Sequence, residues 1–222
     1  MYKGYLRWST LLAGIAAIAA AVFMMRGGSG TPADLWSKAP AELRTVLWPN
    51  AHPVAPFRML TQQRQVFTAE QLRGRWSLVF FGYLGCPDVC PTTLLTLADL
   101  HRRLRAGEGS DAGMQFVFIS VDPANDTPER LAPYLAYFDP SFIGLSGEPA
   151  QLAALARSLG AAYAEHADER GVRSMEHSTS ILLVNPQGWV VGAFPAPHDP
   201  ARIQQQLQYL TRIKYNPSML SI

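Results

Sequence analysis

The chain has 222 residues, of which 48% are hydrophobic and 16% are charged, and its formal net charge is +2. This composition is typical of a packed globular protein and excludes an intrinsically disordered one. The small net charge, with basic residues scattered along the chain, argues against a nucleic-acid partner.

The first predicted element is an apolar helix near the N-terminus. Residues 8–25 contain no charged side chain, and as a helix they span about 27 Å, close to the thickness of a bilayer's hydrocarbon core. Lys3 and Arg7 precede this run, so we expect a cytoplasmic N-terminus and a functional domain outside the cytoplasm, on the periplasmic side in a bacterium. Cleavage at the alanines 19–21, as in a signal peptide, is the alternative. Residues 1–27 are therefore predicted to be a signal or anchor transmembrane segment.

One domain is predicted after this segment. Residues 28–54 are expected to form a linker and wrapping segment, residues 55–212 the folded domain, and residues 213–222 a C-terminal tail. Within the domain the expected elements are strands at 57–60, 65–68, 76–85, 114–122 and 141–147, helices at 91–104, 126–138, 148–160 and 199–213, a capped turn at 68–74 and a hairpin at 179–194.

Strands alternate with helices in this order until the hairpin closes the sheet. Such an order predicts an α/β fold, a thioredoxin-like sandwich with an inserted βα segment. We expect residues 161–178 to form a loop with a bend at Gly171.

Both cysteines of the chain, Cys86 and Cys90, lie four positions apart in the stretch FFGYLGCPDVCPTTL. Cys86 follows a predicted buried strand and Cys90 opens a predicted helix, whose free N–H groups and dipole favour a thiolate. Two cysteines closing so short a loop would constrain the unfolded chain little. The pair therefore indicates chemistry, either a redox disulfide, which could persist in an exported protein, or a site for a soft metal ion. An incidental local disulfide is the third alternative.

A histidine as third ligand would favour the metal. His101 is expected on the solvated side of its helix, and His52 and His198 lie beside prolines in predicted loops. His166 and His177 lie in the predicted loop at 161–178.

In a thioredoxin-like sheet this loop approaches the cysteines with a cis-proline, and here the corresponding position is His177, in Met175-Glu176-His177-Ser178. Two sulfurs and one nitrogen suit Cu(I) and also accept Cu(II), whereas a structural zinc site has four ligands. Met175, two residues before His177, is a further candidate copper ligand, and packing is the preferred role for it.

Three motifs carry a family resemblance: FGYLGCPDVCPTTL at 81–94, ISVDPANDTPERL at 119–131 and MEHSTSILLVNPQG at 175–188. Together they resemble the SCO/SenC family of copper-binding proteins over about residues 55–210. The resemblance implies a membrane-anchored, thioredoxin-like protein that assists assembly of the copper centre of cytochrome c oxidase.

By the same resemblance, Cys86, Cys90 and His177 are the copper ligands. Asp122 matches the acidic residue of the family's VDP motif, which implies a role in tuning the site or docking a partner; a turn-forming role is the alternative. The sequence departs from many members at Leu84-Gly85, where they carry a polar pair, and at Ile181, where they carry an aromatic residue.

Two functions remain open at this point. The first is a copper chaperone, not an enzyme, that passes copper to the copper-bearing subunit of a terminal oxidase and exchanges it with other periplasmic copper carriers. The second is an enzyme, a thiol-disulfide reductase whose redox-active pair is Cys86 and Cys90 and which acts on the cysteines of the oxidase copper site. A thiol peroxidase shares the fold, but the chain lacks the motif that surrounds its single reactive cysteine.

Overall fold

The computed structural model describes residues 36–107, 113–167 and 173–215. The predicted signal or anchor segment at 1–27 and most of the predicted tail at 213–222 lie outside these residues. In the described part of the chain, no helix has both the length and the apolar character needed to cross a bilayer.

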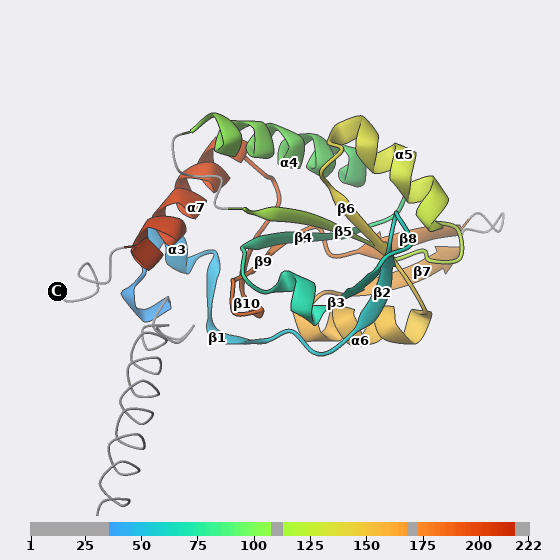
Figure 1. Cartoon of the computed structure of the whole chain (residues 1–222), viewed down its shortest axis with the longest axis horizontal. Coiled ribbons are helices and arrows are strands. Elements are labelled where there is room, and N and C mark those ends of the chain that lie inside the picture. Colours follow the sequence, from blue (N-terminus) through green and yellow to red (C-terminus); the bar gives the residue numbers. More distant parts are fainter. Residues whose placement is uncertain (1–35, 108–112, 168–172, 216–222) are drawn as a thin grey trace, which may run out of the picture.

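A mixed eight-stranded sheet forms the centre of the molecule, in the order β1-β10-β9-β4-β5-β6-β2-β3 (Figure 1). Its strands are β1 (Leu47–Pro53), β2 (Arg58–Thr61), β3 (Val66–Thr68), β4 (Ser77–Gly82), β5 (Gln115–Ser120), β6 (Ile143–Ser146), β9 (Ile181–Val184) and β10 (Trp189–Phe194). Strands β4, β5 and β6 run parallel, and the other pairings are antiparallel. Every residue of β4 and β5 is buried, as expected for strands with helices on both faces.

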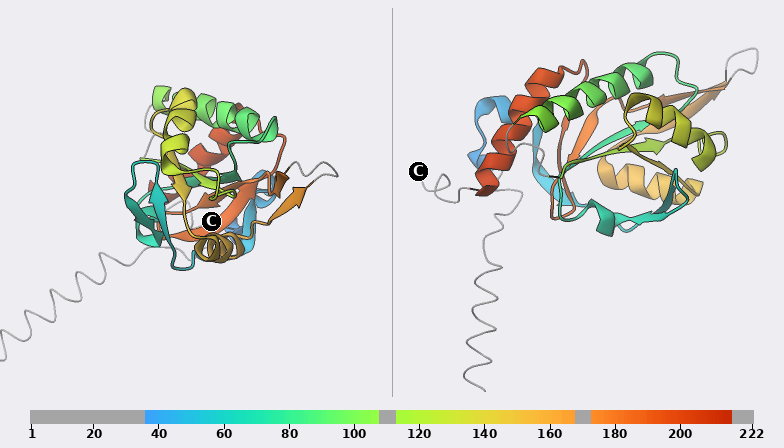
Figure 2. Two further views of the ribbon diagram at one scale, coloured as in Figure 1. Left: turned by 90° about the vertical axis from the view of Figure 1, so that its right-hand side faces the viewer. Right: turned by 45° about the horizontal axis from the view of Figure 1, so that its top comes forward.

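Helices cover both faces of this sheet. Helices α4 (Val89–Ala106), α5 (Pro128–Phe138) and α7 (Pro200–Tyr215) contribute to one core cluster, and α6 (Pro149–Leu159) contributes to the cluster on the opposite face (Figures 1 and 2). The short helix α3 (Ala41–Arg44) packs on the first cluster, and the 3-10 turn η1 (Ala69–Leu72) follows β3. The predicted α/β layering is confirmed.

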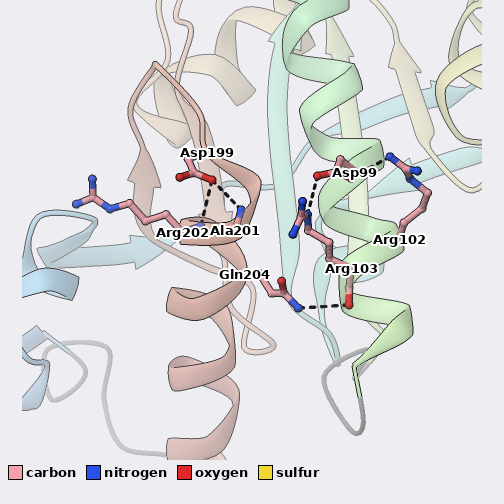
Figure 3. A network of polar contacts seen from close by, with 7 residues as sticks. All are labelled: Asp99, Arg102, Arg103, Asp199, Ala201, Arg202 and Gln204. Carbon is pink, nitrogen blue, oxygen red and sulfur yellow. Dashed lines mark hydrogen bonds and ion pairs between the residues drawn. The ribbon is translucent and has the colours of Figure 1, made fainter.

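One hydrogen bond joins α7 to the end of α4 that lies farthest along the chain from Cys90, and further polar contacts lie within each helix (Figure 3). The Gln204 side chain donates to the Arg103 carbonyl oxygen at 3.3 Å, and Arg103 pairs with Asp99 at 2.6 Å. Asp199 accepts a hydrogen bond from the Ala201 N–H at 2.9 Å and so caps the start of α7. The C-terminal helix is thereby held on the face that also carries the cysteine helix.

Several local signals in the sequence gave the right structure. Thr68 caps η1 and forms a capping box with Gln71. Gly160 ends α6 in the left-handed conformation, with φ of 67°, and Gly188, with φ of 78°, completes the turn between β9 and β10. Pro133 lies inside a continuous α5.

The prediction of a loop over residues 161–178 is wrong for most of the described residues in this range, which form two strands. Residues on either side of its tip form a two-stranded antiparallel sheet of β7 (Tyr163–Ala167) and β8 (Arg173–His177), which projects from one end of the body (Figures 1 and 2). Seven of these ten residues are exposed and none is fully buried, so the two strands lack the clear apolar alternation by which a strand is recognised in a sequence. The predicted bend at Gly171 lies outside the described residues.

Strand β1 was also missed, and His52 lies in this strand and not in a loop. Its sequence, LWPNAHP, holds two prolines, which argue against a strand. The strand tolerates them because it lies at the edge of the sheet, where it pairs with β10 alone. The segment at 28–54 therefore contributes a strand to the main sheet.

Candidate metal centre

The fold brings Cys86, Cys90 and His177 together at one end of the sheet. Cys86 lies in the loop after β4, Cys90 in the first turn of α4, and His177 at the end of β8. Their ligand atoms all lie within 4.8 Å of one another, and they are the only such group of His, Cys, Asp or Glu among the described residues. The Cys90 sulfur is 3.3 Å from His177 Nε2, and the Cys90 N–H points at the Cys86 sulfur at 3.4 Å.

Gly82, the last residue of β4, makes room for the Cys90 sulfur. A Cβ atom at this position would lie 2.8 Å from Cys90 Sγ and 2.7 Å from Cε2 of Phe118. Both distances are shorter than real Cβ contacts, so any side chain here would force the sulfur or the ring to move. The absence of a side chain at Gly82 therefore allows Cys90 to be buried beside β4.

A hydrogen bond to the backbone of the next residue and contacts with two aromatic rings orient the His177 side chain. Its Nδ1 donates to the Ser178 carbonyl oxygen at 3.0 Å, which leaves the lone pair on Nε2, facing Cys90. Phe80 and Tyr83 meet the imidazole edge-on, with centroid distances of 5.8 and 6.0 Å. The imidazole thus presents one basic nitrogen to the two sulfurs, as a metal ligand requires.

The three side chains differ in exposure. Cys90 is fully buried, while Cys86 and His177 are half-buried. Burial raises the pKa of the Cys90 thiol far above its usual value; a hydrogen bond from the Tyr83 backbone opposes this shift, and Cys86 adds to it. The expectation that the helix start would hold Cys90 as a thiolate is wrong for the metal-free protein, because desolvation outweighs the helix terminus.

The side chain of Asp126 holds the cysteine loop in place by hydrogen bonds. Its carboxylate is buried, and Oδ2 accepts hydrogen bonds from the Leu84 N–H at 3.0 Å and the Ser120 hydroxyl at 2.7 Å. Burial raises the pKa of this carboxyl group, and the two hydrogen bonds oppose the shift. Its position just before α5 is typical of a helix cap, but its side chain accepts from the Leu84 N–H and so fixes the backbone two residues before Cys86.

The other candidates lie outside the ligand group. Asp122 forms a turn, in which both carboxylate oxygens accept from the Asn125 side-chain amide at 3.0 and 2.8 Å. Met175 packs against the core cluster on the α6 face, as expected. Both residues line an open cleft of about 500 Å³.

The remaining histidines have partners elsewhere. His166 pairs with Glu176 at 2.9 Å on the exposed hairpin, and Nε2 of His52 and of His198 bonds to a backbone carbonyl oxygen. His101 is only 6% exposed and pairs with Asp139 at 2.7 Å, so its expected place on a solvated face is wrong. It continues the apolar stripe of α4, because it lies four residues after the buried Leu97.

These features define a class of protein. A layered α/β domain of thioredoxin type carries two cysteines at the junction of its central strand and a helix, and a histidine from an adjacent hairpin completes a set of two sulfurs and one nitrogen. Residues 48–212 match the SCO1/SenC family, and the chain belongs to this family.

Relatives and solved structures agree with this assignment. The chain is 37% identical over 156 residues to a "Putative copper-binding protein" of Stutzerimonas stutzeri, a match that covers 70% of this chain and 76% of the relative. It is 33% identical to "Protein SCO1 homolog 1, mitochondrial" of Arabidopsis thaliana, over 65% of this chain and 42% of that longer protein. The structure of Bradyrhizobium japonicum ScoI with copper bound superposes with a TM-score of 0.63 at 34% identity, over 72% of this chain and 99% of that one. Yeast Sco1 with copper bound gives a TM-score of 0.66 at 26% identity, over 72% and 88%.

Proposed function

We propose that this protein binds copper through Cys86 Sγ, Cys90 Sγ and His177 Nε2 and delivers it to the copper centre of a respiratory cytochrome c oxidase. The observation that carries the proposal is the convergence of these three ligand atoms within 4.8 Å. Two thiolates and an imidazole are soft donors that suit Cu(I) and accept Cu(II). No fourth His, Cys, Asp or Glu joins the group among the described residues, whereas a structural zinc site needs four ligands.

The unequal exposure of the ligands suits transfer. Cys90 anchors the ion from the buried side, whereas the half-buried Cys86 and His177 leave the ion within reach of an incoming ligand. Cysteines of the oxidase's copper-bearing subunit could then replace the ligands one at a time, so that the ion is never released into water. Copper-bound relatives and relatives named as Sco proteins support copper as the cargo. The proposal includes a membrane anchor at residues 1–27, which would hold the copper-binding domain outside the cytoplasm.

Thiol-disulfide exchange is the second candidate, because both cysteines are free and adjacent. Cys86 would attack a partner disulfide as the thiolate, releasing one partner thiolate and forming a mixed disulfide. Cys90 would then lose its proton, close the Cys86–Cys90 disulfide and release the second partner thiolate. The partner gains two electrons, and its two thiolates take up, through water, the two protons that the cysteine thiols have lost. Only Cys86 suits the attacking role, because Cys90 is buried with a raised pKa.

Copper binding to the reduced protein, measured anaerobically by stoichiometry and competition, separates these functions. We expect one copper ion per chain in the wild type and an affinity at least about 100-fold weaker in His177→Ala, since a direct ligand matters more than the partners that orient it. His166→Ala removes an exposed histidine from the same hairpin and should bind as the wild type does. Weak binding that is indifferent to His177 would reject the three-ligand site and favour the reductase.

A further inference from the structure

A histidine lies in the loop between β10 and α7, and both ends of this loop are held in place. Phe194, at the end of β10, pairs with Ile181, at the start of β9. At the other end of the loop, the Asp199 side chain caps the start of α7 (Figure 3). Three of the residues 195–200 are prolines, which restrict the backbone between these two points. His198 therefore projects from a fixed stretch of backbone.

The His198 imidazole binds a backbone carbonyl oxygen near the metal centre. Its Nε2 donates a hydrogen bond to the Thr179 carbonyl oxygen at 3.0 Å. Because a carbonyl oxygen can only accept, Nε2 carries the proton, and in the neutral ring Nδ1 is then an acceptor. This Nδ1 is buried and makes no hydrogen bond. A buried polar atom without a partner is costly, and an apolar side chain would avoid the cost. The hydrogen bond to Thr179 is therefore what an imidazole supplies at this position.

The carbonyl oxygen one residue earlier orients the proposed copper ligand. The Ser178 carbonyl oxygen accepts from His177 Nδ1 at 3.0 Å, which leaves Nε2 of His177 facing a cysteine sulfur. The carbonyl oxygens of Ser178 and Thr179 belong to consecutive peptide units, each rigid and planar, so a rotation of one unit moves the other. From the hairpin side, the Ser178 N–H donates to the Ala162 carbonyl oxygen at 2.9 Å. His198 thus holds the second of two units, and the first is bonded to the His177 imidazole.

We propose that His198 is a positioning residue of the metal centre, whose Nε2–H fixes the Thr179 carbonyl oxygen and thereby the orientation of the His177 imidazole. This inference rests on the proposed function, because it takes His177 as a copper ligand. The hydrogen bond keeps the imidazole in one orientation, so less conformational freedom is lost when the ion binds. Partners that orient a metal-binding histidine in this way raise the affinity for the metal.

The test compares His198→Gln with His198→Asn. The Gln amide nitrogen takes the place of Nε2 and reaches the Thr179 carbonyl oxygen, whereas the shorter Asn amide takes the place of Nδ1 and does not. The matched control is His52→Asn, which removes another hydrogen bond from a histidine Nε2 to a backbone carbonyl oxygen, that of Ser158 at 2.9 Å. Two properties of the full-length, copper-loaded protein are measured. The first is copper affinity by competition, and the second is the hyperfine splitting in the Cu(II) EPR spectrum, which reports the geometry of the bound nitrogen.

His198→Asn should bind copper about tenfold more weakly than the wild type and show an altered hyperfine splitting, because His177 loses its support. His198→Gln should restore both properties, and His52→Asn should change neither. If His198→Asn does not fold, His198→Leu, which also lacks the N–H donor, takes its place in the comparison.

The EPR spectrum and the rescue by glutamine decide the outcome. An unchanged spectrum in the variant without the donor overturns the inference even if affinity or stability falls, because packing alone would explain such a fall. A His198→Gln protein that behaves like His198→Asn also overturns it, since the N–H donor would then not be the group that matters. If the wild type binds copper and His177→Ala does not, either result refutes the role of His198 and leaves the proposed function standing. If the wild type binds no copper, both are refuted.

Discussion

Replacing Gly82 with alanine should displace the Cys90 sulfur and weaken copper binding. The new Cβ would lie 2.8 Å from Sγ, and ordinary contact begins at 3.4 Å, so the sulfur must retreat by about 3.4 − 2.8 = 0.6 Å to reach ordinary contact. The buried Phe118 ring, 2.7 Å from the same point, blocks an easier adjustment. A binding constellation tolerates errors of about 0.5 Å, so we expect a loss of copper affinity of about tenfold or more. Overpacking costs about 1–3 kcal/mol, and the reduced entropy of the unfolded chain offsets about 0.4–1 kcal/mol of it, which leaves a net destabilisation of about 1–2 kcal/mol.

Urea unfolding gives the change in stability, and competition with a Cu(I) chelator gives the change in affinity. The matched control is Gly144→Ala, in β6, where the added Cβ would meet the side chains of Leu135, Leu131 and Gln62 and no ligand atom. We expect a comparable loss of stability there, with copper affinity close to that of the wild type. A specific displacement of the Cys90 sulfur is contradicted if Gly82→Ala binds copper as tightly as the wild type, or if both variants lose affinity in proportion to their loss of stability.

Two further predictions concern the carboxylates of Asp126, just before α5, and Asp139, at the end of α5. Asp126→Ala should lower the free energy of unfolding by about 2–4 kcal/mol in a urea titration, because it leaves the buried Ser120 hydroxyl and the partly buried Leu84 N–H without their acceptor. A loss below about 1 kcal/mol would show that these contacts do not anchor the cysteine loop. For Asp139, burial alone would raise the carboxyl pKa, but hydrogen bonds from Ser141 and His101 prevail and lower it. Its stabilising effect is therefore present above the unfolded-state value of about 3.9 and is lost as the pH falls through the folded-state pKa. Asp139→Asn should accordingly be less stable than the wild type at pH 7, with the difference shrinking toward pH 2, and a constant difference across that range would contradict the assignment.

Features that depend on neighbouring residues in the sequence could be predicted from it. Continuous apolar runs identified β4 and β5, and the Thr68 cap and the turn at Gly188 were visible as local chemistry. The two cysteines, and a histidine where a thioredoxin-like protein carries proline, pointed to the residues that the fold brings together.

Features that depend on distant partners could not be predicted. The strand β1 contains two prolines and exists because β10 offers an edge for it. The hairpin of β7 and β8 is mostly exposed, and only Tyr163 and Met175 pack on the core, too few apolar residues to show a period of two in the sequence. The position of Asp126 in the sequence is typical of a helix cap. Its actual partner is the Leu84 N–H, 42 positions away, which only the fold brings to its carboxylate.

The Cys90 thiol shows why a correct local rule can still give the wrong protonation state. A helix N-terminus stabilises a negative charge by up to about 2 kcal/mol. Full burial shifts a pKa by up to about 3–5 units, at about 1.4 kcal/mol per unit, and so outweighs the helix by a factor of two or more. Burial therefore raises the pKa of the Cys90 thiol, while Cys86 and His177 are the half-buried members of the group. For the proposed copper site we therefore expect the accessible ligands to bind first and the buried Cys90 sulfur to bind last, as its proton leaves.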